Sequence, residues 1–246
     1  MFSLYKTVFI YSGYVFIAIL AGFLLSISVP EGKICRQITG FSMEFASGFT
    51  VSIIFLYLIP SAYAFCKLPE LLLFLILGIS TAMLMQERLK YRHRKMSEKN
   101  RIAATEKLSA LSFAISSFIR GISVGTGFGL SAGLAFGLGS ASALDTFSES
   151  SAIFMMSKTS GKSLRKRILC CFCLAVPFLL GYLCGANIVV SDRSWLIRML
   201  IFSGGITMYS AVGDVSIESK LLYRGRYIPI FNISGMIFGI ATVLSG

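Results

Sequence analysis

Charged residues are scarce in this chain: they make up 14% of its 246 residues, whereas hydrophobic residues make up 55%. Soluble domains have about 25% charged residues, so this composition argues against a soluble core. Long apolar runs recur along the whole sequence, and eight spans of about 20 residues with short loops would use up the chain. We therefore expect one all-α transmembrane domain over residues 1–246, with no separate soluble domain.

Histidine is almost missing, and the single copy, His93, lies in a strongly basic segment. Neither a nucleophile–base set nor a histidine-based metal motif occurs in or near the apolar spans, so we do not expect an enzyme or a prosthetic cofactor. The six cysteines lie mostly in or beside apolar runs, which argues against a disulfide framework.

Basic residues exceed acidic ones, giving a net charge of +12. Such an excess can indicate nucleic-acid binding, but here the basic residues lie between apolar runs, as in the cytoplasmic loops of membrane proteins. We predict the lipid bilayer as the partner, with no nucleic acid, and the plasma membrane as the location. The candidate protein partner is a second copy of this chain, which would form a homodimer.

The apolar runs and their breaks predict eight transmembrane helices. The predicted spans are 7–29, 44–65, 70–86, 108–129, 131–157, 168–190, 195–214 and 229–245, with a basic cytoplasmic loop over 87–107. Assigning the loops alternately to the two sides places 18 Lys and Arg residues on one side and 3 on the other. Because basic residues collect in cytoplasmic loops, both termini are predicted to be outside.

The second and seventh spans share a short internal repeat. Phe45-Ala-Ser-Gly48-Phe-Thr50 matches Phe202-Ser-Gly-Gly205-Ile-Thr207, and in the same register Tyr57 falls on Asp214 and Ser61 on Glu218. The two spans are five places apart in the series, so the related helices would run in opposite directions. Inverted repeats of this kind are typical of transporters.

Ionisable residues inside predicted spans are costly and mark candidate functional sites. Asp145 and Glu149 are spaced i, i+4, as are Asp214 and Glu218, so each pair shares a helix face. Paired carboxylates suit a hard divalent cation, although protonation of the acids would also lower their charge. The alternative is a structural ion pair between Arg120, in the fourth span, and one of these acids.

Glycines on a four-residue spacing in and just beyond the fourth span indicate close helix packing. They are Gly121, Gly125, Gly129 and Gly133. We expect this span to lie inside the bundle, with the acids among its neighbours.

Several segments resemble the motifs of the ZIP family of metal permeases (zinc/iron-regulated transporter-like proteins). The second span is similar to F-A-x-G…F-L-H-L-x-P-E-A, and Val176-Pro177 is similar to the family's E-P. Three more segments of this chain resemble the family's motifs for the fourth, fifth and seventh spans. They are Ser116-Ser-Phe-Ile-Arg120-Gly121-Ile-Ser-Val-Gly125, Asp145-Thr146-Phe147-Ser148-Glu149-Ser150 and Gly213-Asp214-Val-Ser-Ile-Glu218. The resemblance covers most of the chain in the family's order.

The resemblance implies eight helices in a 3+2+3 inverted repeat, and a metal site between the fourth, fifth and seventh spans. By position, that site would comprise Ser116, Arg120, Asp145, Thr146, Glu149 and Asp214, with Glu218, Tyr57 and Ser61 as weaker candidates. Asp145, Glu149 and Asp214 are the candidate metal ligands. Arg120 departs from the family, because it places a cation where a ligand is expected.

Three functions follow from these patterns. The first is a ZIP-like transporter of a divalent metal, namely zinc, iron or manganese. The second is a relative that no longer transports, in which Arg120 fills the metal site. The third is a proton-coupled transporter of another solute.

Overall fold

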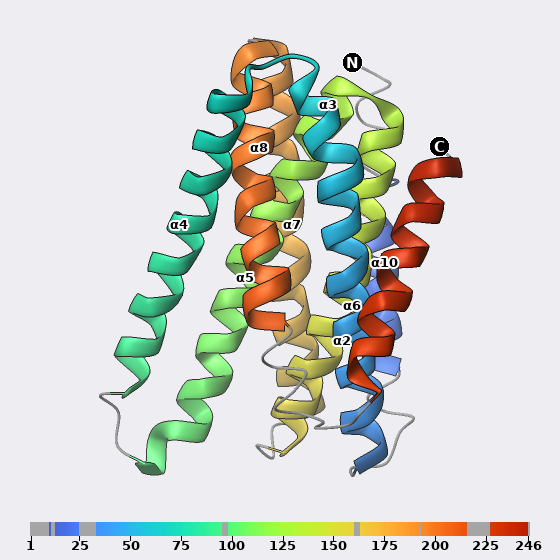
Figure 1. Ribbon diagram of the computed structural model, residues 1–246. Helices are drawn as coiled ribbons and strands as arrows, with labels where there is room; N and C mark the ends of the chain where they lie inside the picture. The colour runs from blue at the N-terminus through green and yellow to red at the C-terminus, as the bar shows by residue number, and fades with distance from the viewer. Residues whose placement is uncertain are drawn as a thin grey trace.

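The computed structural model is a bundle of helices that pack side by side (Figure 1). It describes residues 10, 13–24, 33–94, 98–159, 163–191, 193–215 and 227–245, and these residues contain no β-strand. Its elements are the helix Gly13–Leu24, α2 (Lys33–Ile53), the π-helix η1 (Ile54–Leu58), α3 (Ile59–Tyr63), α4 (Leu68–Arg94), α5 (Glu98–Leu130), α6 (Ala132–Thr159), α7 (Leu164–Ser191), α8 (Arg193–Tyr209), the π-helix η2 (Ser210–Val215) and α10 (Ile228–Ser245). The prediction of an all-α fold is confirmed for this part of the chain.

Each of the eight predicted segments coincides with a helix in its described residues. Among the described residues, four helical stretches can cross a membrane by length and composition: Gln37–Tyr63, Leu68–Met85, Phe113–Leu130 and Ser194–Val212. Three further apolar helices are shorter, namely Gly13–Leu24, Ala175–Asn187 and Pro229–Leu244.

The basic segment at 87–107, expected as a loop, is helical over 87–94 and 98–107, where α4 ends and α5 begins. Its Lys, Arg, Glu and Ala residues are good helix formers. The fall in hydropathy at residue 87 therefore does not end α4, and α5 begins before the next apolar run does.

Two sequence features shape the helices that surround the centre of the bundle. Pro60 has no backbone N–H to continue regular helical bonding, and η1 lies immediately before it, with the Ile59 N–H donating to the Ile54 carbonyl. Ser131 separates α5 from α6, and its hydroxyl accepts a hydrogen bond from the Leu134 N–H at 3.1 Å. This is the N-cap geometry that starts a new helix.

Glycines allow α5 and α7 to approach backbone to backbone. A Cβ added to Gly125 would lie 2.5 Å from the Tyr182 carbonyl oxygen, and one added to Gly185 would lie 2.5 Å from the Ile122 oxygen. Gly121 and Gly181 make equally close approaches. The predicted close packing of Gly121 and Gly125 is therefore confirmed, and the glycine pair that matches them lies on α7.

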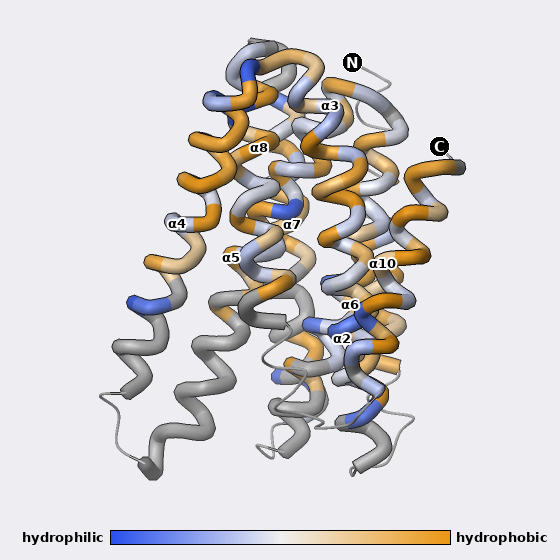
Figure 2. Tube along the Cα trace, viewed as in Figure 1, coloured by the Kyte–Doolittle hydropathy of each residue, from blue (hydrophilic) through white to orange (hydrophobic). Residues whose placement is uncertain are grey.

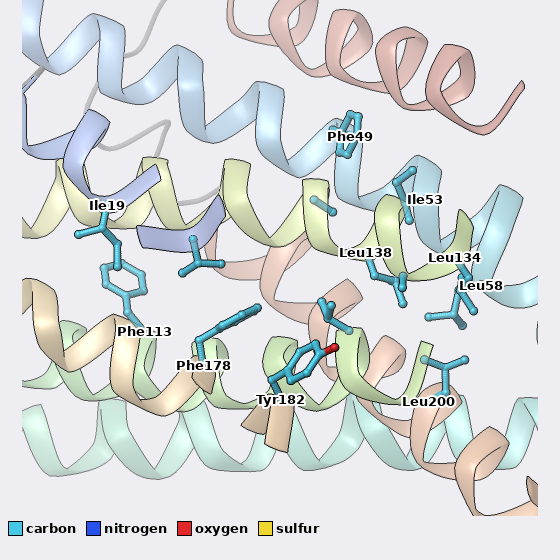
Figure 3. Close-up of a cluster of buried hydrophobic side chains, with 14 of the residues drawn as sticks. Ile19, Phe49, Ile53, Leu58, Phe113, Leu134, Leu138, Phe178, Tyr182 and Leu200 are labelled. Atoms are coloured by element: carbon cyan, nitrogen blue, oxygen red, sulfur yellow. The ribbon is translucent and has the colours of Figure 1, made fainter. Parts of the chain in front are cut away.

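The apolar core lies among the helix Gly13–Leu24, α2, α5, α6, α7 and α8. Figure 3 shows its larger side chains, among which Phe178 and Tyr182 of α7 face the α2 and α6 residues across the bundle. The outer helices are different: α4 is mostly exposed along its apolar stretch, 68–85, and Figure 2 shows hydrophobic residues along α10 and the half of α4 nearest α3. Helices of this kind can bury their apolar surface only in lipid or against another chain.

Candidate functional site

A buried ion pair joins α5 to α6 at the centre of the bundle. The Arg120 side chain is 4% exposed and that of Glu149 is 1% exposed. The guanidinium Nη1 donates to Glu149 Oε1 at 2.9 Å, and Nη2 donates to Glu149 Oε2, so the contact is bidentate. Parallel hydrogen bonds of this type are among the strongest side-chain interactions.

Asp145, one helical turn before Glu149, adds a second carboxylate to the same cation. Its Oδ2 lies 3.5 Å from Arg120 Nη1 and accepts a hydrogen bond from the Thr50 hydroxyl at 3.1 Å. With both acids ionised, the three side chains carry a net charge of −1. In that state the Arg120 guanidinium is the cation of the cluster of Arg120, Asp145, Glu149 and Thr50. It neutralises one of the two carboxylates, and one negative charge is left uncompensated.

A small cavity of about 20 Å³ adjoins this cluster. Its polar lining residues come from the four helices α2, α5, α6 and α8, and its apolar side chains come from the end of α2, η1 and α6. The lining residues are Thr50, Ile53, Ile54, Leu58, Arg120, Ser123, Leu138, Ala141, Ser142, Asp145, Gly204 and Thr207. On its apolar side Leu58 fits against Gly204, where an added Cβ would come within 2.9 Å of the leucine.

Small polar residues let the four helices meet at this point. Thr50 of α2 bonds Asp145 of α6, and Ser123 of α5 donates to Ser203 of α8 at 2.8 Å. These hydroxyls satisfy one another or a carboxylate away from water, which is required of buried polar groups. Short side chains therefore both narrow the spacing of the helices and complete the polar centre.

The structure brings together three of the residues predicted for the site: Arg120, Asp145 and Glu149. Thr146 is fully buried, but its hydroxyl donates to the Ser142 carbonyl of its own helix at 2.7 Å. Ser116 is half-buried on α5, one helical turn before Arg120.

The remaining predicted residues lie on α3, η1 and η2 or beyond them. Tyr57 packs against Gly133 and Gly137 at the start of α6, and Ser61 is half-buried in α3. Asp214 is part of η2, but its side chain lies outside the described residues, as does all of Glu218. No group of three or more His, Cys, Asp or Glu side chains that could hold a metal ion occurs in the part of the chain that the structure describes.

Several polar residues at the centre had no role in the sequence-based prediction. Thr50, Ser123 and Ser142 line the cavity. The signal for Thr50 was its match to Thr207 in the internal repeat, because both threonines line this cavity. Nothing in the sequence distinguishes Ser142 from the many other serines of α6.

A third buried acid, Glu44, lies on α2 away from the Arg120 cluster. It is 2% exposed and accepts a hydrogen bond from the Asn232 amide of α10 at 3.1 Å.

Arg198, which lies inside the predicted seventh span, donates a hydrogen bond to Glu70 at 2.7 Å, with both side chains about one-third exposed. This second pair joins α8 to α4 near one end of both helices.

The chain matches no protein-family model and no curated protein sequence.

Proposed function

We propose that this chain is an integral membrane transporter of ZIP-like architecture whose cation path passes Asp145 and Glu149. In the arrangement described, Arg120 closes that path. The observation that carries the proposal is the buried bidentate contact of Arg120 with Glu149, beside Asp145. Ionisable groups inside a helical bundle are costly and commonly mark ion or substrate pathways.

Integral membrane placement is supported by composition and by the outer helices. Four helical stretches are long and apolar enough to span a bilayer, and the exposed residues of α4 and α10 are largely hydrophobic. A bilayer would cover these faces, whereas water would leave them as large apolar patches. Eight spans with both termini outside remain the proposed topology.

The inverted repeat is supported by the register of helix contacts. The backbone of Gly48 lies against Asn232, and that of Gly205 lies against Leu75; Gly235 lies against Phe45, and Gly78 against Phe202. Each of these four α2 and α10 residues has its counterpart 157 positions away in the α8–α4 contact. The π-helices η1 and η2 fall at nearly the same separation, so these contacts support the repeat beyond the short sequence match.

Arg120 and Glu149 occupy matching positions in the two central helices under this proposal. Gly181 lies against Phe118 of α5, and Gly22 lies against Phe147 of α6, which sets α6 29 residues after α5. The same separation relates Arg120 to Glu149. The ion pair therefore bridges the two halves of the proposed repeat.

A divalent cation such as zinc, iron or manganese is the proposed cargo. Asp145 keeps one carboxylate oxygen without a hydrogen-bond partner among the described residues, and Glu149 would be free for a metal when Arg120 leaves it. Oxygen ligands favour manganese or iron over zinc. Arg120 would have to separate from Glu149 during each transport cycle.

The second candidate is a ZIP-like membrane protein that carries no metal, with Arg120 as its permanent cation. It is favoured by the same bidentate contact, because breaking a buried ion pair is costly. Its role would be structural, regulatory or that of a partner subunit.

Metal uptake into proteoliposomes separates the two candidates. Zinc, iron and manganese uptake would be measured for the unaltered protein, for Glu149→Ala and for the control Ser148→Ala. The Ser148 hydroxyl donates to the Leu144 carbonyl of its own helix. Transport predicts uptake that Glu149→Ala abolishes and Ser148→Ala keeps. Equal uptake by the unaltered protein and Glu149→Ala would refute a path through Glu149.

If the unaltered protein takes up no metal, calorimetric metal binding by Arg120→Glu tests the second candidate. Gain of binding by this variant would indicate that the arginine fills a metal position. A folded variant that still binds no metal would argue against both candidates.

A further inference from the structure

Three buried polar atoms of residues that line the central cavity have no hydrogen-bond partner among the described residues. They are Arg120 Nε, Asp145 Oδ1 and Ser142 Oγ, and all three residues line the same cavity. Their residues are 4%, 4% and 1% exposed. Buried polar atoms are nearly always paired, so three such atoms at one cavity point to a ligand that pairs with them.

The size of the cavity limits this ligand to a single small molecule or ion. Its volume is about 20 Å³, and a water molecule needs roughly 10–15 Å³ together with 2–4 polar partners. The cavity meets both requirements for one water. It has no room for a hydrated ion or an organic solute.

The chemistry of the three atoms distinguishes water from an ion. Arg120 Nε carries an N–H that can only donate, the Asp145 carboxylate can only accept when ionised, and the Ser142 hydroxyl can do either. A bare cation would face the N–H and the positive guanidinium, and an anion would face the carboxylate. Water alone can accept from Arg120 and donate to Asp145 at the same time.

We propose that one water molecule is a fixed part of this site, hydrogen-bonded to Arg120 Nε, Asp145 Oδ1 and Ser142 Oγ. It gives all three guanidinium nitrogens an acceptor, since Nη1 and Nη2 already donate to Glu149. Ser142 and Asp145 lie three residues apart on α6, on one helix face. The water thus adds a further link between Arg120 and α6, whether or not the protein transports metal.

The first test is a structure of the purified protein at a resolution that shows ordered water. The proposal predicts one density peak within hydrogen-bond distance of the three atoms. Absence of a peak would overturn it. So would a peak with contacts of about 2.0–2.6 Å to several oxygens, which is the signature of a coordinated metal cation.

The second test compares thermal unfolding of Ser142→Val and Ser142→Ala in detergent. Valine places methyl groups in the cavity, displaces the water and leaves Arg120 and Asp145 atoms unpaired, so its melting temperature should fall by about 5 °C or more. Alanine keeps room for the water and should cost clearly less. A dry cavity predicts the reverse order, because filling it with valine would stabilise the protein; that result would overturn the proposal.

Discussion

Exchanging the two charges of the central ion pair is the most direct test of how the cluster is built. The four proteins are the unaltered chain, Arg120→Glu, Glu149→Arg and the double variant that carries both substitutions. Arg120→Glu would bring three carboxylates together without a cation, and Glu149→Arg would place two guanidinium groups beside Asp145 alone. Each single substitution therefore leaves buried charges of like sign without sufficient compensation.

The size of the effect follows from burial. Both side chains are at most 4% exposed, so water gives little screening. Removing one partner from a buried pair costs about 3–5 kcal/mol, and each kcal/mol shifts the melting temperature of a chain of this size by about 2–4 °C. We expect each single variant to melt roughly 10 °C below the unaltered protein.

The double variant should recover at least half of the summed loss. Arg120 and Glu149 face one another across the contact of α5 with α6, so the exchanged pair can form the same two hydrogen bonds in the opposite sense. The exchanged arginine would also lie one helical turn from Asp145 on its own helix, which keeps that neighbour. The expected coupling free energy is about 3 kcal/mol or more, which is at or above the top of the range of about 0.5–3 kcal/mol that is usual for residues in contact.

The melting temperatures of all four proteins are measured by thermal unfolding in detergent. Loss of the monodisperse peak in size-exclusion chromatography reports the unfolding. Additive losses, with the double variant the least stable, would refute the reasoning, because the two residues would then act independently. If neither single variant can be purified, recovery of folded protein in the double variant alone gives the same answer.

Two further predictions concern helix packing and the loop between α3 and α4. Gly125→Val should lower the melting temperature by roughly 5–10 °C, because its side chain would meet the Tyr182 backbone. The control Gly13→Val should change the melting temperature little, since nothing lies within 4 Å of the added Cβ. Equal effects of the two substitutions would contradict the close approach of α5 and α7. Burial, and secondarily the charge of Glu70, raises the pKa of the Cys66 thiol. Because only the thiolate reacts, alkylation of a chain that keeps Cys66 as its single cysteine should stay slow until the pH passes that raised pKa. Glu70→Gln should move the half-maximal rate to lower pH, and an unchanged midpoint would contradict the assigned effect of Glu70.

The sequence by itself determined the helical class and the positions of the eight helical segments. Long apolar runs have few alternatives to the α-helix, because their backbone N–H and C=O groups must form hydrogen bonds within the segment. Spacing also placed Asp145 and Glu149 on one face of α6, and the repeat paired Thr50 with Thr207, both of which line the cavity. These are local relations, and helical periodicity is enough to predict them.

Only the tertiary structure decided which acid Arg120 meets and how. The sequence left open a contact with either acid, whereas the structure has two hydrogen bonds to Glu149 and a longer contact to Asp145. The depth and rotation of α5 against α6 depend on close approaches to other helices, such as those of Gly121 and Gly125 to α7. Such contacts join residues more than 50 positions apart, so no local pattern fixes them, and the small polar cavity at Ser142 exists only once those helices are packed.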